Sequence, residues 1–163
     1  MIETTIPLPM LKMVGVFIGT VILVTAAIMA FEYFVPDVKV PNSISIVGYI
    51  VGSMQAGMFA ARTTKQLPNA GEKLVFATWA TAAAALLVIA FMWALFVYNG
   101  VPLTLMTLGT VVTGSVPDAA FLKFLPWILL IGIALNLLIT YCGVGSGAKQ
   151  QLKMLERQAA KGK

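Results

Sequence analysis

Residues 74–98 read LVFATWATAAAALLVIAFMWALFVY, a stretch without a charged side chain. A helix needs about 20 apolar residues to cross the roughly 30 Å hydrocarbon layer of a bilayer, because lipid offers no hydrogen-bond partner to backbone amides. Three further stretches meet this need, at 10–34, 43–61 and 124–144. The sequence therefore predicts an all-α polytopic membrane protein with four transmembrane helices.

The composition agrees with a lipid environment. Of the 163 residues 60% are hydrophobic and only 10% charged, whereas soluble domains are about 25% charged. The net charge of +5 does not indicate a nucleic-acid partner, because the basic residues follow long apolar stretches instead of interleaving with aromatic residues on a polar face. The first apolar stretch is too long for the core of a signal peptide, and we expect it to remain as a membrane anchor.

The basic residues predict an orientation, because lysine and arginine accumulate in cytoplasmic loops. With four spans, the N-terminus, the second loop and the tail share one side of the membrane. Most of the basic residues fall on that side: Lys12, Arg62, Lys65, Lys73, Lys149, Lys153, Arg157, Lys161 and Lys163. Only Lys39 and Lys123 lie opposite. Both termini are therefore predicted to be cytoplasmic.

Local signals mark the loops between the spans. Two prolines in the first loop end one helix, and Asn42 or Ser43 is expected to cap the next. Asn69, with Glu72 three residues later, predicts a capping box that opens the third span. We divide the chain into a four-helix transmembrane domain at 1–147 and a basic cytoplasmic tail at 148–163.

The uncharged segment at 101–117 is the one place where a fifth span is conceivable. Pro102, Gly109, Gly114 and Pro117 oppose a continuous helix. Threonines recur at every third position and form a drifting polar stripe: Thr104, Thr107, Thr110 and Thr113. A fifth span would also place the basic tail opposite the second loop. We expect an interfacial or re-entrant segment between the third and fourth spans.

The residues that usually carry chemistry are missing. The chain has no histidine and a single cysteine, Cys142, so we expect no metal, no haem or other cofactor and no disulfide within the chain. Ser53 has no histidine or nearby lysine to activate it, and the acidic residues are separated by whole spans or loops. Gly143, Gly145 and Gly147 follow an apolar helix instead of a strand, so we interpret them as a flexible helix end. The sequence predicts no catalytic residues and no enzyme.

Three polar side chains lie inside the apolar stretches. Glu32 is close to the end of the first span, where it either anchors that end at the interface beside Tyr33 or couples proton movement to transport. Gln55 and Asn136 lie deeper, where an amide usually forms a hydrogen bond with a neighbouring helix. We expect these two to join helices.

Small residues four positions apart predict helix packing. Gly15 with Gly19, and Gly48 with Gly52, form two such pairs, and Ser53 extends the surface of the second. Such notches let the backbones of membrane helices approach closely. They do not say whether the partner helix belongs to this chain.

The tail combines positive charge with a helical spacing of Leu152, Leu155 and Ala159. It could lie on anionic lipid, each nearby cation contributing about 1 kcal/mol, dock on a partner, or simply fix the topology as a solvated helix.

The second span and the loop after it, from Gln55-Ala56-Gly57 through Phe59 and from Arg62 to Leu67-Pro68 and Glu72, resemble a family of short four-span bacterial inner-membrane proteins of unknown function. The resemblance implies a location in the bacterial inner membrane and brings no activity with it.

Two functions follow as hypotheses. The first is a non-catalytic accessory or assembly subunit that packs against a larger membrane complex. The alternative is a small homo-oligomeric transporter or channel, with Glu32, Gln55 and Asn136 lining a path between protomers. A membrane-embedded enzyme would require a reactive group of residues that the sequence lacks.

Overall fold

The computed structural model describes residues 8–35, 45–102, 104–113 and 116–161. This part of the chain is all-α, as predicted. Its five helices are α1 (Met10–Phe34), α2 (Ser45–Thr64), α3 (Ala70–Tyr98), α4 (Leu105–Thr113) and α5 (Ala119–Lys161). The caps predicted at Asn42 or Ser43 lie outside the described residues.

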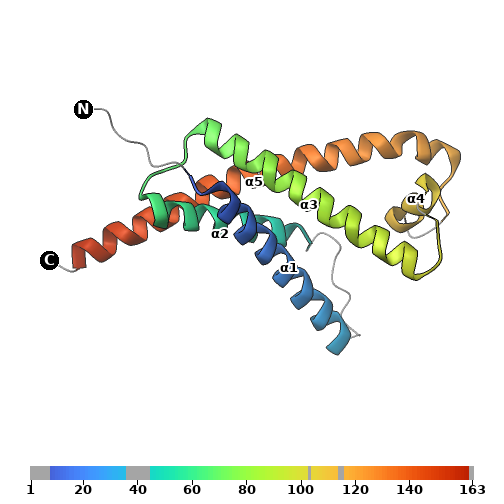
Figure 1. The fold of residues 1–163 in the computed structure, drawn as a ribbon, viewed down its shortest axis with the longest axis horizontal. Coiled ribbons are helices and arrows are strands. Elements are labelled where there is room, and N and C mark those ends of the chain that lie inside the picture. Colours follow the sequence, from blue (N-terminus) through green and yellow to red (C-terminus); the bar gives the residue numbers. More distant parts are fainter. Residues whose placement is uncertain (1–7, 36–44, 103, 114–115, 162–163) are drawn as a thin grey trace.

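The helices are arranged around α5, which runs along most of the length of the molecule (Figure 1). Helix α3 runs in the opposite direction and crosses α5 at an angle, and α2 lies beside the C-terminal half of α5 in the same direction. Helix α1 crosses α2 and the first half of α3 obliquely, and its C-terminal end projects away from the other helices. The short helix α4 closes the far end, between α3 and α5.

Three of the helices, α1, α3 and α5, are long and apolar enough to cross a membrane. Their hydropathy marks the chain as a multi-pass membrane protein with helices in contact with lipid. Helix α2 has 20 residues but is less apolar, and it is not among these candidate spans. The structure therefore shows three of the four predicted spans by this measure. The reason is that α2 contains glycine and serine at its packing positions and the polar residues Gln55 and Arg62 on its exposed side.

The capping box predicted for the third span is confirmed. The Glu72 amide donates to the Asn69 side-chain oxygen at 2.9 Å, and the Asn69 amide donates to the Glu72 carboxylate at 2.8 Å. Two of the amide groups that a helix start leaves unpaired are satisfied in this way. The cap begins α3 at Ala70, four residues before its uncharged stretch.

The segment at 101–117 contains α4, which has nine residues. A helix of this length is about 13 Å long and cannot cross the hydrocarbon layer. Its start is held by Thr104 and Thr107, whose hydroxyl groups each accept a hydrogen bond from the other residue's amide, at 3.2 and 2.9 Å. A Cβ atom on Gly109 would lie 2.7 Å from the ring of Pro117, so glycine lets α4 fold back closely on the chain that follows.

Helix α5 has 43 residues and is therefore about 64 Å long, twice the thickness of the hydrocarbon layer. It runs without a break through residue 147, where we placed the end of the transmembrane domain, and the tail continues the same helix. The interpretation of Gly143, Gly145 and Gly147 as a flexible helix end is wrong. They lie in the interior of α5, where close contact with α2 and α3 constrains the backbone.

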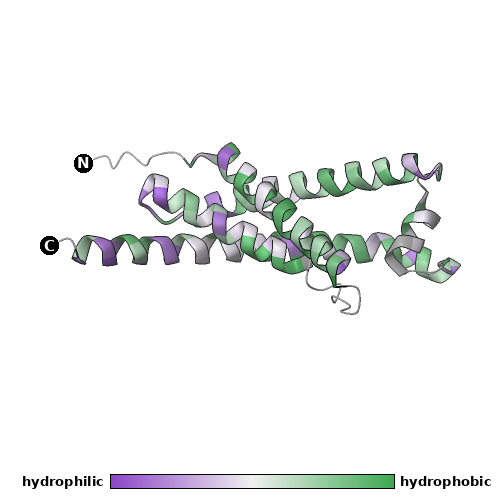
Figure 2. Cartoon of the chain, turned by 90° about the horizontal axis from the view of Figure 1, so that it is seen from below, coloured by the Kyte–Doolittle hydropathy of each residue, from purple (hydrophilic) through white to green (hydrophobic). Residues whose placement is uncertain are grey.

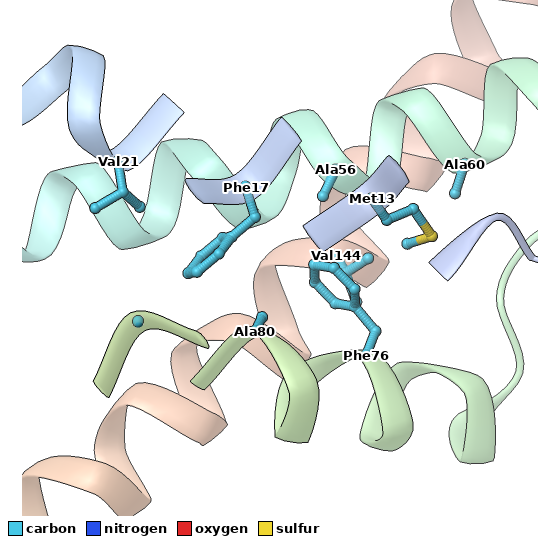
Figure 3. Packing of buried hydrophobic residues seen from close by; sticks show 9 residues of the cluster. Met13, Phe17, Val21, Ala56, Ala60, Phe76, Ala80 and Val144 are labelled. Atoms are coloured by element: carbon cyan, nitrogen blue, oxygen red, sulfur yellow. The ribbon is translucent and has the colours of Figure 1, made fainter. Parts of the chain in front are cut away.

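The buried core lies where four helices meet (Figure 3). Phe17 of α1 and Phe76 of α3 form an edge-to-face pair, with ring centroids 6.2 Å apart and an interplanar angle of 88°. Met13, Ala56 and Val144 complete the contact with no exposed surface. We call this part of the molecule the crossing region.

The opposite end contains few buried side chains. It consists of residues 86–98 of α3, α4, and residues 119–138 of α5, and we call it the hairpin tip. Among its side chains Leu86, Trp93, Trp127 and Ile131 are each more than half exposed. Figure 2 shows that this end is hydrophobic, whereas the hydrophilic residues gather toward the C-terminus.

Candidate functional site

The closest contact between two helices is the one between α2 and α5. A Cβ atom on Gly57 of α2 would lie 2.8 Å from the carbonyl carbon of Val144 and 2.9 Å from its Cα atom. Both of these are backbone atoms, which cannot turn aside as a side chain can. No residue larger than glycine fits at position 57 without moving a helix.

Helix α5 presents glycines in the same way. A Cβ atom on Gly147 would lie 2.7 Å from the carbonyl carbon of Met54, and one on Gly143 would lie 2.8 Å from the Cβ atom of Ser53. The Ser53 hydroxyl donates to the Ile50 carbonyl at 2.9 Å, so it is satisfied within its own helix. We call Ser53, Gly57, Gly143 and Gly147 the glycine seam. It is a pair of small residues four apart on each helix, the pattern that brings membrane helices together.

A second face of α2 packs against α1. A Cβ atom on Gly52 would lie 3.1 Å from both the ring and the carbonyl oxygen of Phe17, and one on Gly48 would lie 3.6 Å from the side chain of Val24. The predicted pair Gly48 and Gly52 thus faces a helix of this same chain. Helix α2 is held on two sides, and small residues line both.

The other predicted pair, Gly15 and Gly19, has a different environment. Both residues are exposed, and no atom counted outside their own helix backbone lies within 4 Å of where a Cβ atom would stand on either. The notch that they form on α1 is open within the described part of the chain.

The glycine seam was missed in three of its four positions, although a signal was present. Ser53 with Gly57, and Gly143 with Gly147, have the same spacing as the pairs that we selected. Gly143 and Gly147 were interpreted as a helix end because they follow an apolar helix instead of a strand. The continuity of α5 through this point is what makes them packing residues.

The three predicted intramembrane polar residues do not converge. Glu32 is exposed on the projecting end of α1 (Figure 1), Gln55 is exposed on α2, and Asn136 is half-buried on α5. The interhelical hydrogen bonds that we predicted for the two amides are not formed among the described residues, and the Asn136 side-chain oxygen is buried without a partner there.

The structure adds further buried oxygens that the sequence did not single out. The Thr81 and Thr140 hydroxyl oxygens and the Gln151 side-chain oxygen have no hydrogen-bond partner within the described residues. By contrast, the Thr64 hydroxyl donates to the Ala60 carbonyl four residues earlier, at 3.0 Å. Three of the unpartnered groups, at 136, 140 and 151, follow the buried side of α5.

Lys73 connects the start of α3 to α5. Its ammonium nitrogen lies 5.1 Å from the centroid of the Tyr141 ring, a distance at which a cation is attracted to the face of an aromatic ring. Its Cδ atom lies 3.4 Å from where a Cβ atom on Gly145 would stand. The first charged turn of α3 is therefore level with residues 141–145 of α5.

Groups suited to catalysis or metal binding do not assemble in the part of the chain that the structure describes. No three histidine, cysteine, aspartate or glutamate residues come together there. A small hollow of about 110 Å³ lies beside the α2–α3 loop, and Thr64, Pro68, Asn69 and Glu72 line part of it. Asn69 and Glu72 are already paired in the capping box, so this hollow presents no free catalytic pair.

Comparison with protein-family models, curated proteins and solved structures found no match.

Proposed function

We propose that this protein is a non-catalytic accessory or assembly subunit that packs against a larger complex in the bacterial inner membrane, with both termini in the cytoplasm. The observation that carries the proposal is the open notch at Gly15 and Gly19. The other two glycine pairs spaced four apart in the described helices, Gly48 with Gly52 and Gly143 with Gly147, are in contact with a neighbouring helix.

The difference between the open pair and the contacted pairs matters because a notch on a helix surface does not improve the packing of lipid tails. Helix association in membranes depends on close packing, and small residues are enriched where backbones approach. Glycine also lowers helix propensity by about 1 kcal/mol relative to alanine, so a pair of glycines in the N-terminal half of α1 has an energetic cost. A helix of another protein seated at Gly15 and Gly19 would offset that cost.

The alternative is a homo-oligomeric transporter or channel. The buried, unpartnered oxygens of Thr81, Asn136 and Thr140 favour it, because polar groups inside the membrane often mark a path for a substrate or an ion. The separation of Glu32 from Gln55 and Asn136 weighs against a path within one protomer. In an oligomer such a path would have to form between copies.

Purification from native membranes in a mild detergent, followed by mass spectrometry, separates the two functions. The accessory role predicts a foreign membrane protein in fixed stoichiometry, and the transporter predicts only copies of this chain.

The informative variant is Gly19→Leu. Because the space around Gly19 is open, the variant should fold normally and lose the foreign partner.

Leu23→Ile, an exposed change one turn further along α1, is the matched control and should retain the partner. A preparation that contains only this chain, as a defined oligomer, would overturn the accessory role. So would a foreign partner that binds Gly19→Leu as well as the native protein.

A further inference from the structure

The C-terminal part of α5 carries a row of basic residues on one side. Lys149, Lys153, Arg157 and Lys161 are four positions apart and all exposed. Successive helical residues are about 100° apart, so these four side chains share a sector of about 120°. Glu156 is the one acidic residue in this part of the helix. We call this sector the basic face.

The opposite side of the same helix faces the bundle. Gln151 is buried there, and Leu152 and Leu155 are half-buried. The basic face is therefore turned away from the other helices. No ion pair joins its side chains to another residue in the described part of the chain, so its charges are available to a partner.

The contact between Lys73 and α5 indicates where the membrane boundary lies relative to the basic face. Lys73 immediately precedes the uncharged stretch of α3, and it is level with Gly145, so the hydrocarbon boundary crosses α5 near that residue. With a rise of 1.5 Å per residue along the helix axis, Lys149 lies about 6 Å further along α5 than Gly145, Arg157 about 18 Å and Lys161 about 24 Å.

These distances exceed the reach of the lipid. The headgroup layer is about 5 to 8 Å thick on each side, and salt screens exposed charges beyond about 8 Å under physiological conditions. Lys149 can meet phospholipid headgroups, but Arg157 and Lys161 stand clear of them. Helix α5 continues through the tail as one helix (Figure 2), which favours docking on a partner over the alternative in which the tail lies on anionic lipid.

We propose that the basic face docks an acidic surface on the water-exposed part of the partner complex. The inference rests on the proposed accessory function and its orientation. Charge complementarity identifies the occupant: a protein surface with carboxylates spaced to meet cations about 6 Å apart along a helix. Because the tail continues α5 as a formed helix, little ordering entropy is lost when it binds.

Two neighbouring positions provide the test. Ala160 lies within the sector of the basic face, whereas Ala159 lies on the opposite side of the helix. A photo-crosslinking benzoylphenylalanine is placed at one position or the other in the full chain, irradiated in native membranes, and the adducts are identified by mass spectrometry. We expect protein adducts at Ala160, within a peptide of net negative charge, and at least tenfold fewer at Ala159.

Charge reversal completes the test. The double variant Lys153→Glu, Arg157→Glu should lower the adduct yield at Ala160 at least tenfold, and Lys153→Arg, Arg157→Lys should preserve it. The inference would be overturned by adducts with phospholipid at Ala160, by equal yields at the two positions, or by the lack of any protein adduct. It would also be overturned by an adduct yield at Ala160 that does not change on charge reversal. If the foreign partner still co-purifies under any of these outcomes, the accessory function stands and only the docking surface is wrong.

Discussion

The crossing region and the hairpin tip share helices α3 and α5, yet they differ in how their helices meet. In the crossing region glycine and alanine let α2 approach α1 and α5 until backbone atoms touch. At the hairpin tip the same α5 is surrounded by large exposed side chains, and only 6% of its most apolar stretch of 18 residues is buried. The comparison teaches that apolarity places a helix in lipid, while small residues decide where it meets another helix.

The largest effect should come from a bulky residue in the glycine seam. Gly147→Leu would place a side chain against the backbone of Met54, and overpacking costs about 1 to 3 kcal/mol even where neighbouring side chains can move. Because the backbone of Met54 cannot move aside in this way, we expect loss of the folded protein. It would be measured as aggregation in detergent gel filtration and as the absence of a cooperative thermal transition.

Gly132→Leu is the control at the hairpin tip. No neighbouring atom lies within 4 Å of a Cβ atom there, and the variant should fold with unchanged thermal stability. Equal damage at Gly132 and Gly147 would show that the two regions do not differ in packing.

The next effect concerns the aromatic core. Phe76 is fully buried, and Phe76→Ala should lower the free energy of unfolding by about 2 to 3 kcal/mol. This is less than the 3 to 5 kcal/mol typical of such changes in water-soluble cores, because lipid can replace part of the lost apolar contact. Phe91→Ala, at a position 54% exposed on the hairpin tip, should cost less than about 1 kcal/mol. Unfolding titrations of both variants in mixed micelles measure the two losses. A larger loss of unfolding free energy for Phe91→Ala than for Phe76→Ala would contradict the comparison of the two regions.

A smaller effect on stability is expected at the start of α3, which lies at the edge of the crossing region. Asn69→Ala removes the side-chain acceptor of the capping box and should cost about 1 kcal/mol. Asn69→Asp keeps an acceptor and should cost little. A thermal transition in detergent that does not change with Asn69→Ala would show that packing of α3, and not its cap, fixes where the helix begins.

The smallest effect tests the buried hydroxyl groups. Thr140→Val removes an unpartnered oxygen while keeping the side-chain shape, so stability should stay within about 0.5 kcal/mol or rise, because burying an unsatisfied polar group has a cost. Thr64→Val removes a hydroxyl that donates to the Ala60 carbonyl and should lose slightly more. A clear loss at Thr140 in unfolding titrations would mean that its hydroxyl has a partner in the membrane.

The sequence by itself determined the class of protein and the course of most helices. Met10–Phe34 begins and ends where the apolar stretch does, since the cost of unpaired amides in lipid forces such a stretch to be helical. The cap at Asn69 followed equally directly, because a capping box depends on residues three positions apart. These features are local, and so they can be inferred from composition and spacing alone.

Only the tertiary structure decided which small residues are used. Gly15 with Gly19 and Gly143 with Gly147 have the same spacing, yet the first pair is open and the second touches the backbone of α2. Spacing tells which residues share a face of a helix, but not what lies opposite that face. The same limit applies to Gln55 and Asn136, because a hydrogen bond between helices depends on their relative register, which is set by how the backbones of α2 and α5 fit together.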